Sequence, residues 1–316
     1  MLSSYYRDRG RSDREEPGER VQAVLQELDK LVGLDPIKEL VKEIRAYVEI
    51  GKRRQAEGLL AEPMSWHMIF KGNPGTGKST VARLIGRLFK ELGLLSQGHL
   101  VEVERADLVG EYIGHTAHKT REQLRKALGG VLFIDEAYSL ARGGERDFGR
   151  EAIDVLVKGM EDHRENLLLI LAGYKEEMDY FLEVNPGLRS RFAIHLEFPD
   201  YSVSELLSIA EVMLKDRQYF LTLEARVELE RIIRREILSG HRYNGNARMV
   251  RNIIEKAIRR QAVRLADKIS VAREDLMTIT IEDLVGLSQV KGYRQNGKER
   301  HSSIQETYQI CYNNPL

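Results

Sequence analysis

Apolar residues along the first two thirds of the chain form two alternating patterns, short continuous runs and helical stripes. Five segments have the length of strands: WHMIF (66–70), HLVEVER (99–105), VLFIDEA (131–137), LLLILAGY (167–174) and AIHLEF (193–198). The apolar run is continuous in two of them, VLFIDEA and LLLILAGY. Between the five segments, residues 77–92 carry an apolar helical stripe and residues 116–128 predict a second helix. Uninterrupted apolar strands are typical of parallel sheets covered on both faces. We therefore predict an α/β domain with a doubly wound parallel sheet.

The pattern changes after Pro199, where helical spacing continues with no strands in between. Three segments show it, at 202–217, 223–238 and 246–266. Consecutive amphipathic helices pack on one another around their own apolar core. The sequence therefore predicts a second, smaller domain made of helices.

Helical spacing also fills residues 21–52, ahead of the sheet, and is broken there by GLDPIKEL. Asp35 can cap a helix and Pro36 suits a first helical position, so we expect a helix to start there. The two ends of the chain are polar and poorly periodic. The predicted parts are a flexible leader at 1–20, the α/β domain with N-terminal linker helices at 21–199, the helical domain at 200–284, and a tail at 285–316 that is flexible or orders only on a partner.

Composition narrows the class of protein without naming it. The chain has 316 residues and equal numbers of basic and acidic side chains, 49 each. Zero net charge argues against nucleic acid as a partner, because phosphate backbones usually select a basic excess. The single cysteine, Cys311, excludes a disulfide framework within one chain. No secretory signal and no run approaching the roughly 18 apolar residues of a membrane span is visible, so we expect a cytoplasmic protein.

Residues 72–79 read GNPGTGKS and match the phosphate-loop pattern G-x-x-x-x-G-K-[ST] between a predicted strand and a predicted helix. Glycines let such a loop turn its N–H groups onto phosphate oxygens, and the helix dipole adds to the attraction. The lysine reaches the β- and γ-phosphates, and the serine hydroxyl can ligate Mg²⁺. The alternative is a glycine- and proline-rich loop without function. The expected ATP-binding residues are Gly72, Asn73, Pro74, Gly75, Thr76, Gly77, Lys78, Ser79 and Thr80.

Two acids close the apolar run VLFIDEA, where a buried strand has no structural need for charge. Asp135 suits a direct or water-mediated contact with Mg²⁺, together with Ser79. Glu136 is placed to polarise the water that attacks the γ-phosphate. The alternative is a pair of solvated residues at a strand end. His67, His99, His163 and His195 lack partners at metal-ligand spacing, and we expect these side chains to be solvated or internally satisfied.

The order of phosphate loop, FIDEA, NPGLRSRF (185–192) and GNARMVR (245–251) resembles an AAA+ ATPase. The resemblance covers about residues 30–283. The segments GLDPIKELVKEI, NPGTGKSTVARLIGRLF and LAGYKEEM are most similar to the branch that contains stage V sporulation protein K and the red-type Rubisco activases. The resemblance implies an α/β nucleotide-binding domain with a helical lid, and hydrolysis of ATP.

The resemblance also implies assembly, because members of this family form hexameric rings with ATP between subunits. Arg189 and Arg191 fall where arginine fingers reach a neighbour's γ-phosphate, and Arg248 falls at the sensor-2 position of the lid. Exposed structural charges are the alternative for each arginine. Tyr174 stands at the sensor-1 position, where many members have a smaller polar residue, so its role is contact with phosphate or water, or plain packing.

The stretch EYIGH lies where remodelling members of the family have their first pore loop. There, Tyr112 and Ile113 would face a threaded protein chain and Gly114 would let the loop flex. The alternative is a strand end that packs both side chains on the core. In LVGLDP, Val32 and Leu34 match the segment beside adenine, with core filling as the alternative.

Three kinds of function are compatible with these motifs. The first is a ring-forming ATPase that remodels a protein substrate, either like stage V sporulation protein K or like a Rubisco activase. The second is a DNA motor or clamp loader, which the zero net charge argues against. The third is an ATP-dependent assembly switch or scaffold with little hydrolysis, which Glu136 argues against.

Overall fold

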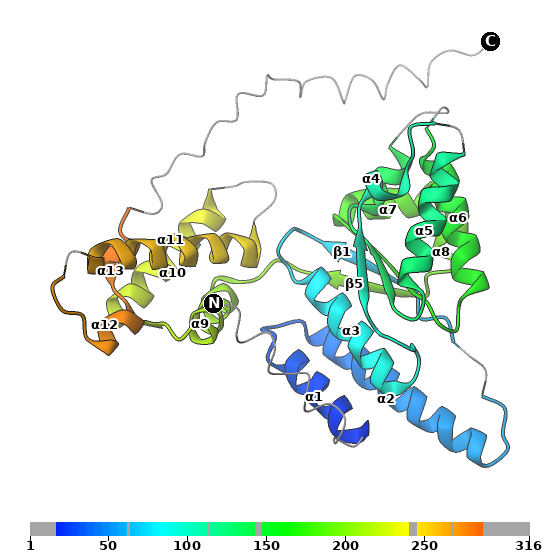
Figure 1. Ribbon diagram of the computed structural model, residues 1–316, viewed down its shortest axis with the longest axis horizontal. Helices are drawn as coiled ribbons and strands as arrows, with labels where there is room; N and C mark the ends of the chain where they lie inside the picture. Colours follow the sequence, from blue (N-terminus) through cyan, green and yellow to red (C-terminus); the bar gives the residue numbers. More distant parts are fainter. Residues whose placement is uncertain are drawn as a thin grey trace, which may run out of the picture.

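A computed structural model describes residues 17–61, 64–112, 114–142, 147–239, 245–266 and 268–286. Figure 1 shows an α/β body and, beside it, a lobe made almost entirely of helices. The chain passes from one to the other after the last strand of the sheet. Residues 1–16 of the expected leader at 1–20, Ile113, and the tail beyond residue 286 lie outside the described residues.

The body is built on a five-stranded parallel sheet in the order β2-β3-β4-β1-β5. Its strands are β1 (Met68–Gly72), β2 (Leu100–Val103), β3 (Val131–Ile134), β4 (Leu168–Gly173) and β5 (Ile194–Phe198). Strand β1 pairs with β4 through Phe70 opposite Ala172, and with β5 through Phe70 opposite Leu196. The order places β4 between β1 and β3, and because all strands are parallel their carboxyl ends share one edge. The predicted doubly wound sheet is confirmed.

Alternate residues of each strand enter two separate cores, as period-two side chains must in a sheet covered on both faces. Met68 and Phe70 belong to the core under α1, α2 and α3, whereas Ile69 belongs to the core on the opposite face. The helices on the first face are α1 (Pro17–Asp29), α2 (Asp35–Ala56) and α3 (Lys78–Leu92). Those on the second face are α4 (Arg105–Leu108), α5 (His115–Ala127), α6 (Gly149–Asp162), α7 (Lys175–Glu183) and α8 (Pro186–Arg189), with the 3₁₀ helix η1 (Ala137–Ala141).

The N-terminal helices differ from the prediction in two details. Helix α1 begins at Pro17, inside the expected leader, because Val24 and Leu28 bury against α3 and order the turn ahead of them. Helix α2 does begin at GLDP, but Asp35 is its first residue rather than its cap. The capping position is Leu34, in the left-handed conformation with φ 62° and no side-chain cap bond. Leu34 holds this conformation because its side chain is buried.

The helical lobe has its own apolar core, separate from those of the sheet. It consists of α9 (Val203–Asp216), α10 (Leu223–Leu238), α11 (Asn246–Ala266), α12 (Arg273–Met277) and α13 (Ile281–Leu284), with a two-stranded sheet of β6 (Phe220–Leu221) and β7 (Thr278–Ile279). Ser202 caps α9 and Thr222 caps α10 through side-chain oxygens. The three long helices match the segments predicted after Pro199 within one residue.

Candidate active site

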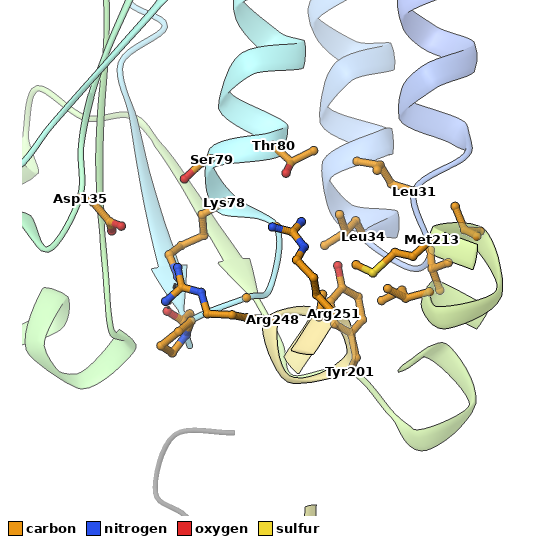
Figure 2. A pocket seen from close by; sticks show the side chains of 18 of the residues that line it. Leu31, Leu34, Lys78, Ser79, Thr80, Asp135, Tyr201, Met213, Arg248 and Arg251 are labelled. Atoms are coloured by element: carbon orange, nitrogen blue, oxygen red, sulfur yellow. Dashed lines mark hydrogen bonds between the residues drawn. The ribbon is translucent and has the colours of Figure 1, made fainter. Parts of the chain in front are cut away.

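A cavity of about 450 Å³ opens between the carboxyl edge of the sheet and the helical lobe. The phosphate loop, the ends of β3 and β4, the turn between α1 and α2, and helices α9 and α11 all line it. Figure 2 shows these side chains converging from the different elements. The edge of the sheet where its strands end is the expected place for a ligand in a doubly wound fold.

The phosphate loop adopts backbone angles that explain two of its glycines. Gly75 has φ +75° and Gly77 has φ +99°, in the region that L side chains rarely adopt. Gly77 caps α3, which starts at Lys78. The Thr76 hydroxyl turns inward and donates to the Asn73 carbonyl at 2.8 Å. The helix N-terminus therefore faces the cavity, as the motif predicts for an anion site.

The Lys78 side chain folds back over the phosphate loop and contacts the start of that loop. Its ammonium donates to the carbonyl oxygens of Gly72 and Asn73, both at 2.8 Å. Burial lowers the pKa of Lys78, and the nearby Asp135 carboxylate opposes that shift. A buried cation beside a cradle of N–H groups favours a polyanionic ligand such as a triphosphate.

The two acids at the end of β3 both line the cavity. The Glu136 backbone N–H donates to Asp135 Oδ1 at 3.0 Å and so orients that carboxylate. Glu136 itself has φ 47°, a left-handed conformation that is unfavourable for a non-glycine residue. Ser79 lines the same cavity. Its hydroxyl and the Asp135 carboxylate are hard oxygen donors of the kind Mg²⁺ takes alongside phosphate oxygens, so the donor set fits that ion.

Tyr174 lies between the phosphate loop and the acids, because it follows β4 and β4 runs between β1 and β3. It lines the cavity, and its ring centroid is 5.9 Å from that of Tyr138. Burial raises the pKa of Tyr138, whose ring also carries the Arg142 guanidinium at 4.5 Å. Tyr174 therefore packs on Tyr138 and also lines the cavity, and its contact with phosphate or water stays a prediction.

The opposite end of the cavity is apolar. Val32 and Leu34 line it together with Ile209 and Met213 of α9. Leu34 belongs to the α1–α2–α3 core as well, so adenine contact and core filling are compatible at this residue. An apolar end beside a phosphate cradle suits the base and the phosphates of a nucleoside triphosphate.

Two arginines of the lid reach the cavity from α11. Arg248 and Arg251 are one helical turn apart, and Figure 2 shows both side chains pointing from the lid toward Lys78, Ser79 and Thr80. Arg248 was expected here and Arg251 was missed. The spacing of three in GNARMVR contained the signal, because residues three apart share a helix face.

Arg189 and Arg191 do not line this cavity. Arg189 is exposed at the end of α8. Arg191 pairs with Glu161 at 2.6 Å and donates to the Gly187 carbonyl at 2.8 Å. Neither arginine therefore completes the site of its own chain.

Tyr112 lies on the loop between α4 and α5, away from the cavity, with 65% of its surface exposed. Its only ring contact among the described residues is with His115, edge-on at 5.4 Å. Gly114 follows with φ +81° and caps α5. The exposed ring excludes core packing as the role of Tyr112.

His67 is a core residue whose ring nitrogens have partners inside the protein, which is one of the two situations expected for the histidines. It is buried, its Nδ1 accepts from the Leu169 N–H at 3.1 Å, and burial lowers its pKa. Throughout the described part of the chain, no three histidine, cysteine or acidic side chains converge as a metal site. Any bound Mg²⁺ would depend on phosphate oxygens for much of its coordination.

Comparison with known families matches both parts of the chain. Residues 68–200 match the ATPase family associated with various cellular activities (AAA), and residues 202–292 match the AAA lid domain. A solved structure of a RuvB mutant from Thermotoga maritima superposes with a TM-score of 0.54 at 20% identity, covering 92% of this chain and 81% of that one. At that identity the likeness supports the fold alone. Fold and site together define an AAA+ ATPase.

Several relatives are much closer in sequence. Stage V sporulation protein K of Bacillus subtilis is 54% identical over 84% of each chain, and plasmid protein CbxX of Cupriavidus necator is 48% identical over 84% of each. The chloroplastic ribulose bisphosphate carboxylase/oxygenase activase of Cyanidioschyzon merolae is 46% identical over 84% of this chain and 92% of that one. The chain belongs to the AAA family, in the group that contains these proteins. Within the described residues, no helix is long and apolar enough to cross a membrane.

Proposed function

We propose that this ATPase is a ring-forming remodeller of protein substrates of the stage V sporulation protein K kind, a homohexamer with ATP and Mg²⁺ bound between subunits. The observation that carries the proposal is the divided site. One chain supplies the phosphate loop, both acids and the lid arginines, whereas Arg189 and Arg191 lie away from the cavity. An arginine finger at either of these two positions would then act on the γ-phosphate of a neighbouring subunit, in addition to the lid arginines of the same chain.

Each residue of the cavity has one role in this proposal. Lys78 and the loop N–H groups bind the β- and γ-phosphates, and Arg248 contacts the γ-phosphate from the lid. Glu136 orients and deprotonates the attacking water. Tyr174 lines the cavity between the phosphate loop and Glu136. Mg²⁺, held by Ser79 and Asp135 with phosphate oxygens, would neutralise charge on the triphosphate. A neighbour's Arg189 or Arg191 then stabilises the charge that develops on the transferred phosphoryl group.

The loop at residues 111–114 is proposed to face the axial channel of the ring. Tyr112 is exposed and lies outside the nucleotide cavity, so its ring is available to another molecule. An aromatic side chain offers a large apolar contact at low entropy cost and tolerates many partner sequences. Gly114 supplies the left-handed turn at the end of this loop.

The pore assignment is tested by crosslinking, because side chains around a sixfold axis converge on one another. Tyr112→Cys is made with Cys311→Ser and with Glu136→Gln, which is expected to hold ATP. A short bis-maleimide should then produce crosslinked multimers with ATP and only monomers without it. Tyr180→Cys is the matched control, since Tyr180 is 57% exposed on α7. Assembled rings that give no more crosslinking at 112 than at 180 would contradict the pore.

A Rubisco activase function is the second candidate, favoured by the relative of that name at 46% identity. Both candidates share the nucleotide site and differ in the protein substrate. Restoration of carboxylase activity to an inhibited ribulose bisphosphate carboxylase, dependent on ATP, would favour it over the sporulation-type remodeller. An assembly switch with little hydrolysis would instead show no multiple-turnover ATPase activity.

A further inference from the structure

The first turn of α11 lies directly against the phosphate loop, and Gly75, Ala247 and Arg248 at this contact also line the cavity. Three consecutive loop carbonyls accept hydrogen bonds from the lid and its connection. The bonds are Asn246 Nδ2 to Pro74 O at 3.3 Å, the Ala247 N–H to Gly75 O at 3.2 Å, and the Tyr201 hydroxyl to Thr76 O at 3.1 Å. The lid is therefore attached to the loop directly, without a nucleotide between them.

Asn246 is the centre of this attachment. Its side chain is 1% exposed and its backbone is left-handed, with φ 44°. Besides Pro74, its amide donates to Asp200 Oδ1 at 2.8 Å, and its Oδ1 accepts from the Tyr201 N–H at 3.0 Å. A buried amide with both ends paired fixes its own orientation.

Asp200 provides a second connection between the Asn246 side chain and the phosphate loop. Its carboxylate accepts from Asn73 Nδ2 at 2.9 and 3.0 Å, as well as from Asn246. Asp200 stands at the junction between the sheet and the lid, right after Pro199. One carboxylate therefore joins the start of the phosphate loop to the start of α11. We call the set Asn73, Asp200, Tyr201 and Asn246 the loop–lid clasp.

A phosphate cradle needs its N–H groups turned toward the ligand, so its carbonyl groups turn the other way. Buried carbonyls that lack donors are costly, and a loop without donors behind it would relax toward other conformations. We propose that Asn246 and Asp200 are positioning residues, which hold the phosphate loop in its phosphate-binding conformation and couple the lid to nucleotide affinity. This inference rests on the proposed role of the phosphate loop.

The close approach of the two elements agrees with that role. A Cβ added at Gly75 would lie 2.9 Å from the Arg248 backbone nitrogen and 3.2 Å from its Cβ. The loop glycine therefore gives room to the lid as well as to phosphate. Arg248 follows Asn246 by two residues, so a lid released at Asn246 also withdraws its arginine from the cavity. Of the clasp residues, Tyr201 lines the cavity, whereas Asn73, Asp200 and Asn246 do not. The loop that they hold would bind phosphates common to ADP and ATP, so loss of the clasp should weaken both ligands.

The chemistry of the pair allows a swap experiment. Asn246→Asp places a carboxylate against Asp200 and removes the donor to Pro74. Asp200→Asn removes the charge but leaves an acceptor for Asn73. In the double variant, Asn246→Asp with Asp200→Asn, the new amide can donate to the new carboxylate, which still accepts from the Tyr201 N–H. Only a direct pairing of the two side chains predicts that the double variant is better than Asn246→Asp alone.

Calorimetry with ADP and with a non-hydrolysable ATP analogue measures the effect. We expect Asn246→Asp to weaken both ligands by at least about tenfold, Asp200→Asn by about threefold, and the double variant to return within about threefold of the natural protein. Asn166→Asp is the control, because its Oδ1 also accepts a backbone N–H, from Ser96 at 3.1 Å. Amide hydrogen exchange in residues 72–77 should be faster in the Asn246→Asp single variant than in the double variant.

The outcomes separate this inference from the proposed site. Unchanged affinity in Asn246→Asp, or a double variant no better than that single one, overturns the clasp. Should Asn246→Asp fail to fold, equal affinity of Asp200→Asn and the natural protein overturns it. Lys78→Ala is measured in parallel. If it retains nucleotide, the phosphate-loop assignment itself is wrong, whereas loss of binding there with unaffected clasp variants contradicts the clasp only.

Discussion

Glu136 combines a strained backbone with a place in the cavity. Its φ of 47° is uncommon for a residue with a side chain, and such outliers persist where the surrounding structure holds them. Here β3 ends at Ile134 and η1 begins at Ala137, so the chain turns sharply through Asp135 and Glu136. The turn brings the carboxylate to the cavity edge while its N–H orients Asp135.

Glu136→Gln should keep nucleotide affinity and lose turnover, since an amide cannot accept the proton of the attacking water. A general base contributes about 10²–10⁴-fold, so we expect kcat to fall by that factor. Multiple-turnover phosphate release measures it, and calorimetry with ATP checks that binding persists. Glu183→Gln, an exposed position at the end of α7, is the isosteric control. Turnover equal to that of the natural protein would exclude Glu136 as the base.

At the scale of elements, the lid depends on a buried ion pair that holds α13 against α11. Asp283 is 1% exposed, and Arg264 donates to both its oxygens, at 2.9 and 2.8 Å. Burial alone would raise the pKa of Asp283, but the bonds from Arg264 and Thr280 outweigh it and lower that pKa. The carboxylate is thus more stable in the folded lid than in the unfolded chain.

The sign of the linkage follows from the lowered pKa. Above the unfolded value of about 3.9 the carboxylate contributes its full stabilisation, and the contribution is lost as pH falls through the folded pKa. We expect thermal stability of the lid to drop below about pH 4 in the natural protein. Asp283→Asn should lower stability at pH 7 by about 3 kcal/mol and flatten this acid dependence. Calorimetric unfolding from pH 7 to pH 3 measures both, and an unchanged pH profile in the variant would contradict it.

At the scale of the whole molecule, the position of Arg189 and Arg191 outside the cavity supports the proposed ring. Arg189 ends α8, whose Leu188 packs in the core on the second face of the sheet, and Arg191 follows two residues later, whereas the cavity lies between the sheet edge and the lid. Arg191 is engaged with Glu161 on its own chain, and this ion pair would have to open or pivot for it to reach a neighbour. Exposed pairs of this kind are worth about 0–1 kcal/mol, so the pair is no barrier.

Mixing variants tests whether the arginines act on a neighbour. Arg189→Ala and Arg191→Ala each remove one candidate finger. The variant that lacks the true finger should have a kcat lower by about 10³-fold or more. Lys78→Ala subunits should bind no ATP yet still offer both arginines. A mixture of that arginine variant with Lys78→Ala should regain activity that neither has alone. Arg234→Ala, a surface residue paired with Glu230 on α10, is the control. A mixture as inactive as its parts would contradict a shared site.

Three features of the structure do not follow from the sequence predictions: helix α6, the capping residue of α2, and the contact between Asn246 and Asp200. Helix α6 carries an apolar stripe that includes Ile153, Leu156 and Met160, so a local signal for this helix is present in the sequence. Asp35 was expected to cap α2, yet burial of Leu34 decided the capping position. Asn246 and Asp200 are 46 residues apart, and local pattern gives no sign that they touch. Contacts of that kind depend on how the lobes pack.

The sequence by itself determined the parallel sheet, the three long lid helices and the phosphate loop, because apolar period and glycine spacing act locally. Only the tertiary structure decided which of the candidate residues lie together in the cavity and which lie outside it. It placed Tyr174 between the loop and the acids through strand order, left Tyr112 exposed, and kept Arg189 and Arg191 out of the cavity. The reason is that these facts depend on packing between segments far apart in the chain, which no local pattern encodes.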